Sequence, residues 1–157
     1  MQLPTENQRE ETPIRQDVLR GHYLFEQAQF RYHPEDPRMA LRINRLEIKP
    51  GEKVAILGRN GAGKSTLLQA MAGGMDLAGG ELRLDNFSLP HLDVADVRRN
   101  VGFMTQNARL FYGTLRENIT LGMPRATDEE IFEVLELTGA AGFVQKLPKG
   151  LDYPIME

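Results

Sequence analysis

A glycine-rich string that ends in a lysine and two hydroxyl residues restricts the fold of this chain more than any other feature. The string is Gly58-Arg59-Asn60-Gly61-Ala62-Gly63-Lys64-Ser65-Thr66, and it lies between an apolar run at residues 54–57 and a helix-like stretch at residues 67–72. It matches G-x-x-x-x-G-K-[ST] in the strand–loop–helix order that a phosphate-binding loop requires. Glycines allow the backbone to approach phosphate oxygens closely, with successive N–H groups directed inward. The sequence therefore predicts binding of a nucleoside triphosphate.

The side chains of this loop have distinct expected roles. The Lys64 ammonium can reach the β- and γ-phosphates, the Ser65 hydroxyl can coordinate Mg²⁺, and the helix N-terminus favours the negative charge. Asn60 is a candidate for a γ-phosphate contact, whereas Arg59 is expected to point to solvent or to a partner subunit. The predicted ligand-contacting positions of the loop are Gly58, Asn60, Gly61, Ala62, Gly63, Lys64, Ser65 and Thr66.

The composition of the chain excludes or disfavours several classes of partner and of chemistry. The formal net charge of −3, with Lys and Arg scattered along the chain, disfavours a nucleic-acid partner. The absence of cysteine excludes disulfides, thiolate metal sites and cysteine catalysis. No apolar run approaches the ~18 residues that span a bilayer, and the N-terminus has no signal-peptide pattern. These observations predict a soluble chain.

The pattern along the chain predicts a strand-rich first part and a helical second part. Residues 1–20 are polar, contain two prolines and show no apolar periodicity, so they are interpreted as a linker or tail. Besides the run at 54–57, strands are predicted at residues 23–32, 41–48, 81–84 and 101–105.

Later in the chain, residues 127–130 (Thr-Asp-Glu-Glu) form a predicted capping box at the start of a helix. Ile131, Val134, Leu135 and Thr138 fall on one face of that helix, which is predicted to end at Gly139. A second short helix is predicted to end near Leu147. The apolar face is interpreted as core packing of a helical subdomain.

Several motifs, in order, resemble those of the nucleotide-binding domain of ABC transporters. Phe30-Arg31-Tyr32 resembles the aromatic loop whose ring stacks on adenine, and Gln106 resembles the Q-loop glutamine. Residues 110–119 (LFYGTLRENI) are similar to the L-F-x-G-T-x-R-E-N-I stretch of exporters, and residues 147–152 (LPKGLD) resemble the lead into the signature motif. The resemblance covers residues 22–157. Among exporters, the sequence is most similar to that of type I secretion ATPases.

The resemblance implies an α/β fold of the P-loop NTPase class, of which we expect this chain to be an incomplete part. A RecA-like core would carry an antiparallel β-subdomain and the start of a helical subdomain. It implies a linker at 1–20 and a partial ATP-binding domain at 21–157, with the core at 21–106 and the Q-loop and helical subdomain at 106–150.

The resemblance also implies ATP and Mg²⁺ as ligands. Tyr32 would stack on the base, Lys64 and Gln106 would have catalytic roles, and Ser65 and Gln106 would bind the metal. A neutral amide at Gln106 can coordinate Mg²⁺ and orient the attacking water without competing for protons. Judged without the family, Tyr32 is more simply a core aromatic of a strand and Gln106 a surface glutamine.

Other motifs of the family are missing. No run of four apolar residues ends in Asp-Glu, no L-S-G-G-Q string occurs, and no histidine follows a late strand. Residues 128–130 (Asp-Glu-Glu) begin a helix instead. We therefore expect a longer complete molecule, an unpaired apolar edge at residues 54–57, and negligible ATP hydrolysis by this chain alone.

For the complete protein, the resemblance implies an ABC-type ATPase that couples ATP binding and hydrolysis to export, of the type I protein-secretion kind. The implied partners are a second nucleotide-binding domain, in a homodimer, and a transmembrane domain in the same full-length chain, at the cytoplasmic face of a bacterial inner membrane. The alternatives are a soluble ABC-type ATPase, which the exporter-like residues 110–119 disfavour, and a non-hydrolysing ATP-binding module. A phosphate-loop GTPase is disfavoured because no N-K-x-D motif occurs.

Overall fold

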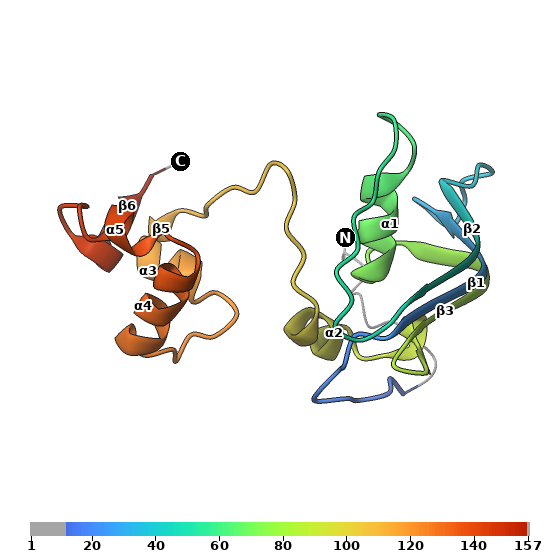
Figure 1. Ribbon diagram of the computed structural model, residues 1–157, viewed down its shortest axis with the longest axis horizontal. Coiled ribbons are helices and arrows are strands. Elements are labelled where there is room, and N and C mark those ends of the chain that lie inside the picture. The colour runs from blue at the N-terminus through green and yellow to red at the C-terminus, as the bar shows by residue number, and fades with distance from the viewer. Residues whose placement is uncertain (1–11, 157) are drawn as a thin grey trace, which may run out of the picture. The chain divides into compact units, whose positions relative to one another are not determined.

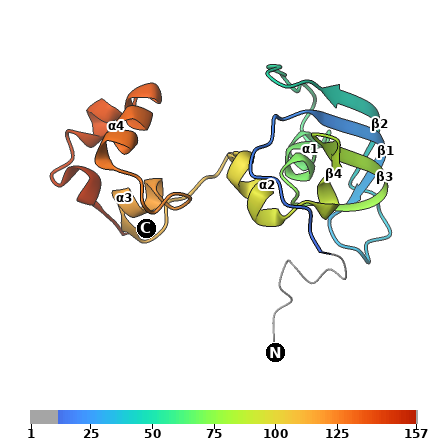
Figure 2. The same ribbon diagram turned by 90° about the horizontal axis from the view of Figure 1, so that it is seen from below.

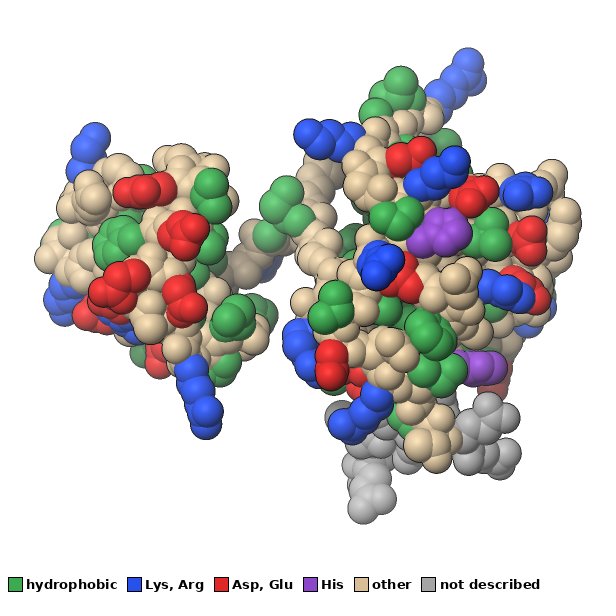
Figure 3. Space-filling view, turned by 60° about the horizontal axis from the view of Figure 1, so that its bottom comes forward, with side chains coloured by type: hydrophobic (Ala, Val, Ile, Leu, Met, Phe, Trp, Pro, Cys, Tyr) green, Lys and Arg blue, Asp and Glu red, His purple; other side chains and the backbone are tan. Residues whose placement is uncertain are grey.

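The computed structural model describes residues 12–156, which form two compact units that divide between Phe103 and Met104 (Figure 1). Residues 1–11, the first part of the predicted linker, lie outside the described residues, as does Glu157. No helix among residues 12–156 is long and apolar enough to cross a bilayer. Basic and acidic side chains are interspersed on the face drawn in Figure 3.

The first unit is built on a four-stranded antiparallel sheet with the strand order β2-β1-β3-β4. Its strands are β1 (Tyr23–Arg31), β2 (Leu41–Ile48), β3 (Asp76–Leu84) and β4 (Phe87–Ser88). This sheet confirms the predicted antiparallel part of the fold, and β1, β2 and β3 overlap the strands predicted at residues 23–32, 41–48 and 81–84.

A β-bulge keeps both halves of β1 directed toward the core. Tyr23 and Phe25 are buried before the bulge, and Ala28 and Phe30 are buried after it, so one extra residue interrupts the alternation. That extra residue is Gln27, which has a φ of 49° and lies where the register between β1 and β3 shifts. Without the additional residue, the second half of β1 would turn its aromatic ring to solvent.

Helices complete the core of the first unit. They are α1 (Lys64–Met71), the 3₁₀ turn η1 (Leu89–His91) and α2 (Val94–Asn100). Ala70 of α1 and Val97 of α2 pack into the same apolar cluster as Phe25 and Phe30 of the sheet. Tyr23 donates a hydrogen bond to the Met71 carbonyl at 2.9 Å, and its burial, aided by Asp85, raises its pKa to about 12.

The second unit is mainly helical. Its elements are β5 (Gly113–Thr114), α3 (Leu115–Ile119), α4 (Asp128–Leu137), α5 (Ala141–Val144), η2 (Gly150–Asp152) and β6 (Pro154–Ile155). Its core is formed by Ile131, Leu135, Val144 and Leu151. The predicted capping box of Thr127 and Glu130 is confirmed at the start of α4. Val134 is 51% exposed, so the buried face of α4 is narrower than predicted.

Polar contacts fix the ends of the helices in this unit. The Arg116 guanidinium pairs with Asp128 and, at 3.3 Å, with Asp152, and its hydrogen bond lowers the pKa of the Asp128 carboxyl. A second capping box joins Thr114 and Glu117 at the start of α3, and the hydrogen bonds from the Thr114 backbone and hydroxyl lower the pKa of Glu117. This second box was not predicted from the sequence.

Two predicted strands are wrong for the described residues. Residues 54–57 and 101–105 have irregular backbone, and Val54 and Leu57 are 53% and 91% exposed. A parallel strand is stable only when neighbouring strands satisfy its backbone groups and layers cover both of its faces. Neither segment pairs with another strand in the part of the chain that the structure describes. The predicted RecA-like parallel core is therefore absent from residues 12–156, whereas the antiparallel sheet is formed.

Candidate phosphate-binding site

The glycine-rich loop leads directly into α1, and two of its glycines have conformations that other residues rarely adopt. Gly61 and Gly63 have φ values of 81° and 89°, in the left-handed region. Gly63 is the N-cap of α1, and a Cβ at this position would lie 3.2 Å from Leu41 Cδ1. The left-handed backbone conformation therefore favours glycine at this position, and an added Cβ would also displace the Leu41 side chain by a few tenths of an ångström.

Lys64 reaches back across the loop that precedes it. Its Nζ donates hydrogen bonds to the carbonyl oxygens of Gly58 and Arg59, each at 2.8 Å. An ammonium has three donors, so one donor remains for a further acceptor. A positive charge is thereby held over the curved backbone of the loop by the loop itself.

The first turn of α1 offers additional donors. The backbone N–H groups of Lys64, Ser65 and Thr66 donate no hydrogen bond within the described residues, as expected for the first turn of a helix. Ser65 is exposed, whereas Thr66 is only 6% exposed. A cation, a row of free amides and a free hydroxyl together fit a polyphosphate with a bound divalent cation. The residues present therefore suit both ATP phosphates and Mg²⁺.

The aromatic residue predicted to contact the base lies beside this loop. Tyr32 directly follows β1, and its hydroxyl lies 2.8 Å from the Thr66 Oγ1 of α1. Its side chain is 54% exposed, so it is not the core aromatic that the strand pattern alone would favour. The structure thus brings Tyr32 and the phosphate loop together, through a hydroxyl contact that no pattern in the sequence indicates.

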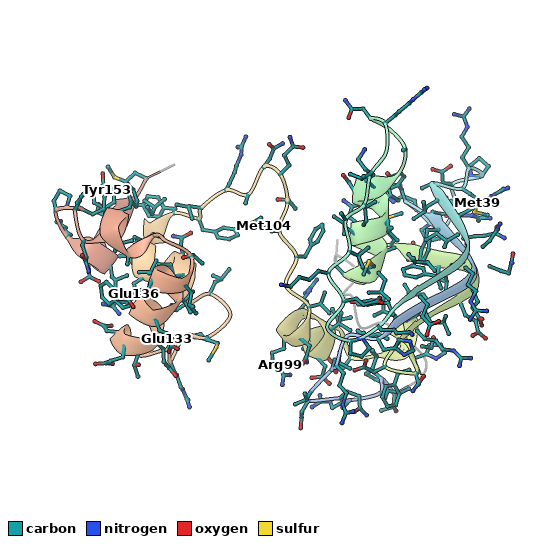
Figure 4. The ribbon with its side chains drawn as sticks, viewed as in Figure 1. Met39, Arg99, Met104, Glu133, Glu136 and Tyr153 are labelled. Carbon is teal, nitrogen blue, oxygen red and sulfur yellow. The ribbon has the colours of Figure 1, made fainter. Side chains whose placement is uncertain are left out.

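The structure of the described residues shows no contact that supports the roles predicted for Asn60 and Gln106. Asn60 is exposed, and its side chain makes no hydrogen bond within the described residues, while the Ala62 N–H donates to the Arg59 carbonyl at 3.1 Å in a turn. Gln106 lies in a turn of the second unit, after the 87% exposed Met104 (Figure 4), and not at the end of a strand. Its contact with Mg²⁺ stays a prediction.

Comparison with known proteins gives consistent matches. The profile of a family described as "ABC transporter" matches residues 41–151. A putative multidrug export ATP-binding/permease protein of Staphylococcus aureus (strain NCTC 8325 / PS 47) is 33% identical over 141 residues, which are 90% of this chain and 24% of that protein. The protein with the corresponding description from strain Mu50 / ATCC 700699 matches to the same extent.

A solved structure supports the same relationship. The structure of a bacterial Atm1-family ABC exporter with ATP bound is similar with a TM-score of 0.83 and 28% identity, over 95% of this chain and 26% of that chain. The chain thus spans about a quarter of the length of the proteins that it matches.

Proposed function

Since the chain belongs to the ABC transporter family as an ATP-binding domain, we propose that it binds Mg-ATP and serves as the ATP-binding part of a longer exporter. The observation that carries the site is the position of Lys64, whose ammonium is held over the loop while the amides that follow it are free. We assign the β- and γ-phosphates to Lys64 and the loop amides, and Mg²⁺ to Ser65. We further propose that Asn60 contacts the γ-phosphate and that Gln106 contacts Mg²⁺.

Tyr32 is proposed to bind the purine ring of ATP. Its aromatic ring is half exposed beside α1, and an aromatic face attracts any base by stacking. Its link to Thr66 joins the residue that would contact the base to the helix that follows the phosphate loop. Stacking contacts the flat face of a purine and does not depend on the substituents that distinguish adenine from guanine. ATP and GTP are therefore expected to compete for this site.

Replacing Tyr32 by alanine is expected to weaken Mg-ATP binding by roughly 5- to 150-fold, because base–aromatic stacking is worth about 1–3 kcal/mol. Tyr32→Phe retains the ring and should keep most of the affinity, although it loses the hydroxyl contact with Thr66. The measurement is calorimetric titration of the chain with Mg-ATP and, separately, with inorganic triphosphate.

Inorganic triphosphate serves as the control ligand because it has no base. Its affinity should be the same for the native chain and for Tyr32→Ala. Equal loss of affinity for ATP and for triphosphate would mean that Tyr32 supports the loop and does not contact the base. Failure of the native chain to bind either ligand would contradict the proposed function itself.

At the level of the longer protein, we propose an ATPase that dimerises with an identical domain and is coupled to a transmembrane domain in the same chain, on the cytoplasmic side of the membrane. The related proteins from Staphylococcus aureus are described as ATP-binding/permease proteins, which supports a fused transmembrane part. Hydrolysis by the present residues alone is expected to be negligible, because no apolar run in the sequence ends in Asp-Glu.

Two substrate classes are open to such an exporter. The resemblance of the chain to type I secretion ATPases favours protein export, whereas the relatives are described as multidrug exporters. Stimulation of ATP hydrolysis in the full-length protein distinguishes the two classes. We propose that an unfolded secretion substrate stimulates hydrolysis and that small lipophilic compounds do not; the reverse result would assign the chain to multidrug export.

A further inference from the structure

The segment at residues 14–22, which we call the N-terminal strap, contains no helix or strand, yet it is attached to the first unit along its whole length. It begins with a parallel bridge between Ile14 and Leu92. The Ile14 N–H donates to the His91 carbonyl at 2.8 Å, and the Asp93 N–H donates to the Ile14 carbonyl at 2.8 Å. In Figure 2 the chain runs beside α2 before it enters β1.

Side chains of α2 hold the middle of the N-terminal strap. Asp96 Oδ2 accepts a hydrogen bond from the Gln16 N–H at 2.9 Å. Asn100 makes two contacts, because its Oδ1 accepts from the Leu19 N–H at 3.0 Å and its Nδ2 donates to the Asp17 carbonyl at 3.2 Å. These contacts are with the backbone of the strap, so they fix its path whatever side chains the strap carries.

The end of the N-terminal strap is fixed by the turn between β3 and β4. The Asp85 carboxylate accepts hydrogen bonds from the backbone N–H groups of Arg20 and His22, the latter at 2.8 Å. The Asp85 N–H in turn donates to the His22 carbonyl at 2.9 Å. The side chain of Leu19, between these attachment points, packs against the core of the first unit.

The position of Asp96 shows that the contact with the N-terminal strap is part of the fold. Its carboxylate is 3% exposed, and burial of a charge is costly unless hydrogen bonds compensate it. The compensating donors are the Gln16 N–H and the Arg99 guanidinium, the latter at 2.7 Å; Arg99 is labelled on α2 in Figure 4. Removal of the strap would leave one buried carboxylate oxygen without this donor.

We propose that α2 is a docking face for the N-terminal strap and that Asp96 and Asn100 are positioning residues that fix where the chain enters the ATP-binding unit. Asp96 and Asn100 are four residues apart and therefore lie on one face of the helix. The strap and α2 then move as one body.

The test is amide hydrogen exchange of the chain without nucleotide, resolved by residue with NMR, so that its outcome is independent of ATP binding. In the native chain, the amides of Ile14, Gln16, Leu19, Arg20 and His22 should exchange at least about tenfold more slowly than unstructured amides. The intervening amides donate no hydrogen bond within the described residues and should exchange fast: Arg15, Asp17, Val18 and Gly21. Uniformly fast exchange across residues 14–22 would overturn the proposal.

Substitutions of Asn100 separate positioning from general stability. Asn100→Ala should accelerate exchange of the Leu19 amide by about tenfold or more, whereas Asn100→Asp retains an acceptor oxygen and should restore its protection. The amide of Val101, which donates to the Val97 carbonyl at 2.8 Å, should exchange faster when the strap is released.

Amides of β1 and β3 serve as internal controls and should be unaffected by either substitution. The matched control variant is Arg15→Ala, which removes only the ion pair, at 3.6 Å, between the exposed Arg15 guanidinium of the strap and Asp93. Unchanged exchange of Leu19 in Asn100→Ala, or an equal acceleration in β1 and β3, would overturn the proposal.

Discussion

Replacing Lys64 by alanine is expected to weaken Mg-ATP binding by this chain by more than an order of magnitude. The substitution removes the ammonium that bridges the Gly58 and Arg59 carbonyls and, in the proposed complex, the β- and γ-phosphates. Truncating one partner of such a hydrogen-bonded charge pair costs about 2–5 kcal/mol. That cost lowers the affinity by roughly 30-fold to several thousand-fold. Calorimetric titration with Mg-ATP measures the change.

Arg59→Ala is the matched control for this substitution. Arg59 is an exposed cation of the same loop, and only its carbonyl oxygen, which alanine retains, contacts Lys64. Its removal should change the affinity by less than about threefold, because an exposed charge contributes little. Neither variant nor the native chain should hydrolyse ATP. Equal losses in both variants would show that binding follows net positive charge and not the geometry of Lys64.

Replacing Gly80 by alanine is expected to destabilise the first unit by about 3–5 kcal/mol or to prevent its folding. Gly80 has a φ of 72°, and a Cβ built on it would lie 2.1 Å from the Gln27 carbonyl oxygen and 2.5 Å from that of Glu26. These contacts are with backbone at the β-bulge, so no side-chain movement relieves them. The measurement is the free energy of unfolding from urea denaturation, with the sheet followed by far-ultraviolet circular dichroism.

Gly79→Ala tests the same strand without the clash. A Cβ on Gly79 would first meet the Gln29 side chain at 3.8 Å, which is an ordinary contact. Its free energy of unfolding should therefore stay within about 1 kcal/mol of the native value. Equal free energies of unfolding for Gly80→Ala and Gly79→Ala would contradict the close contact between Gly80 and the backbone of the β-bulge. The bulge would then not account for the burial of both halves of β1.

Features that depend on neighbouring residues were predictable from the sequence. Aromatic, strand-like composition predicted β1 and alternating apolar residues predicted β2, and the Thr127 and Glu130 pair predicted the start of α4. The glycine-rich string predicted a closely curved loop and the helix that follows it. In each case the signal and the structure lie within the same short stretch of chain.

Features that depend on distant partners were not predictable in this way. Residues 54–57 and 101–105 have the composition of strands, but a strand also requires a neighbour, and composition does not supply one. Helix α2 was missed, although Asp93 is a good N-cap whose side chain accepts from the Ala95 N–H at 2.8 Å. The N-terminal strap could not be foreseen, since its hydrogen bonds to Asp96 and Asn100 use backbone N–H groups that every residue except proline carries.

The measurement that tests the central claim most directly is a titration of the isotopically labelled chain with Mg-ATP, followed through the backbone amide resonances. We predict saturable shifts at Gly61, Gly63, Lys64, Ser65 and Thr66, whose N–H groups donate no hydrogen bond within the described residues, with smaller shifts at Tyr32. Amides of α4 should be unaffected. Saturable binding that leaves the loop amides unchanged, or no binding at millimolar Mg-ATP, would contradict the assignment of this loop as the ATP site.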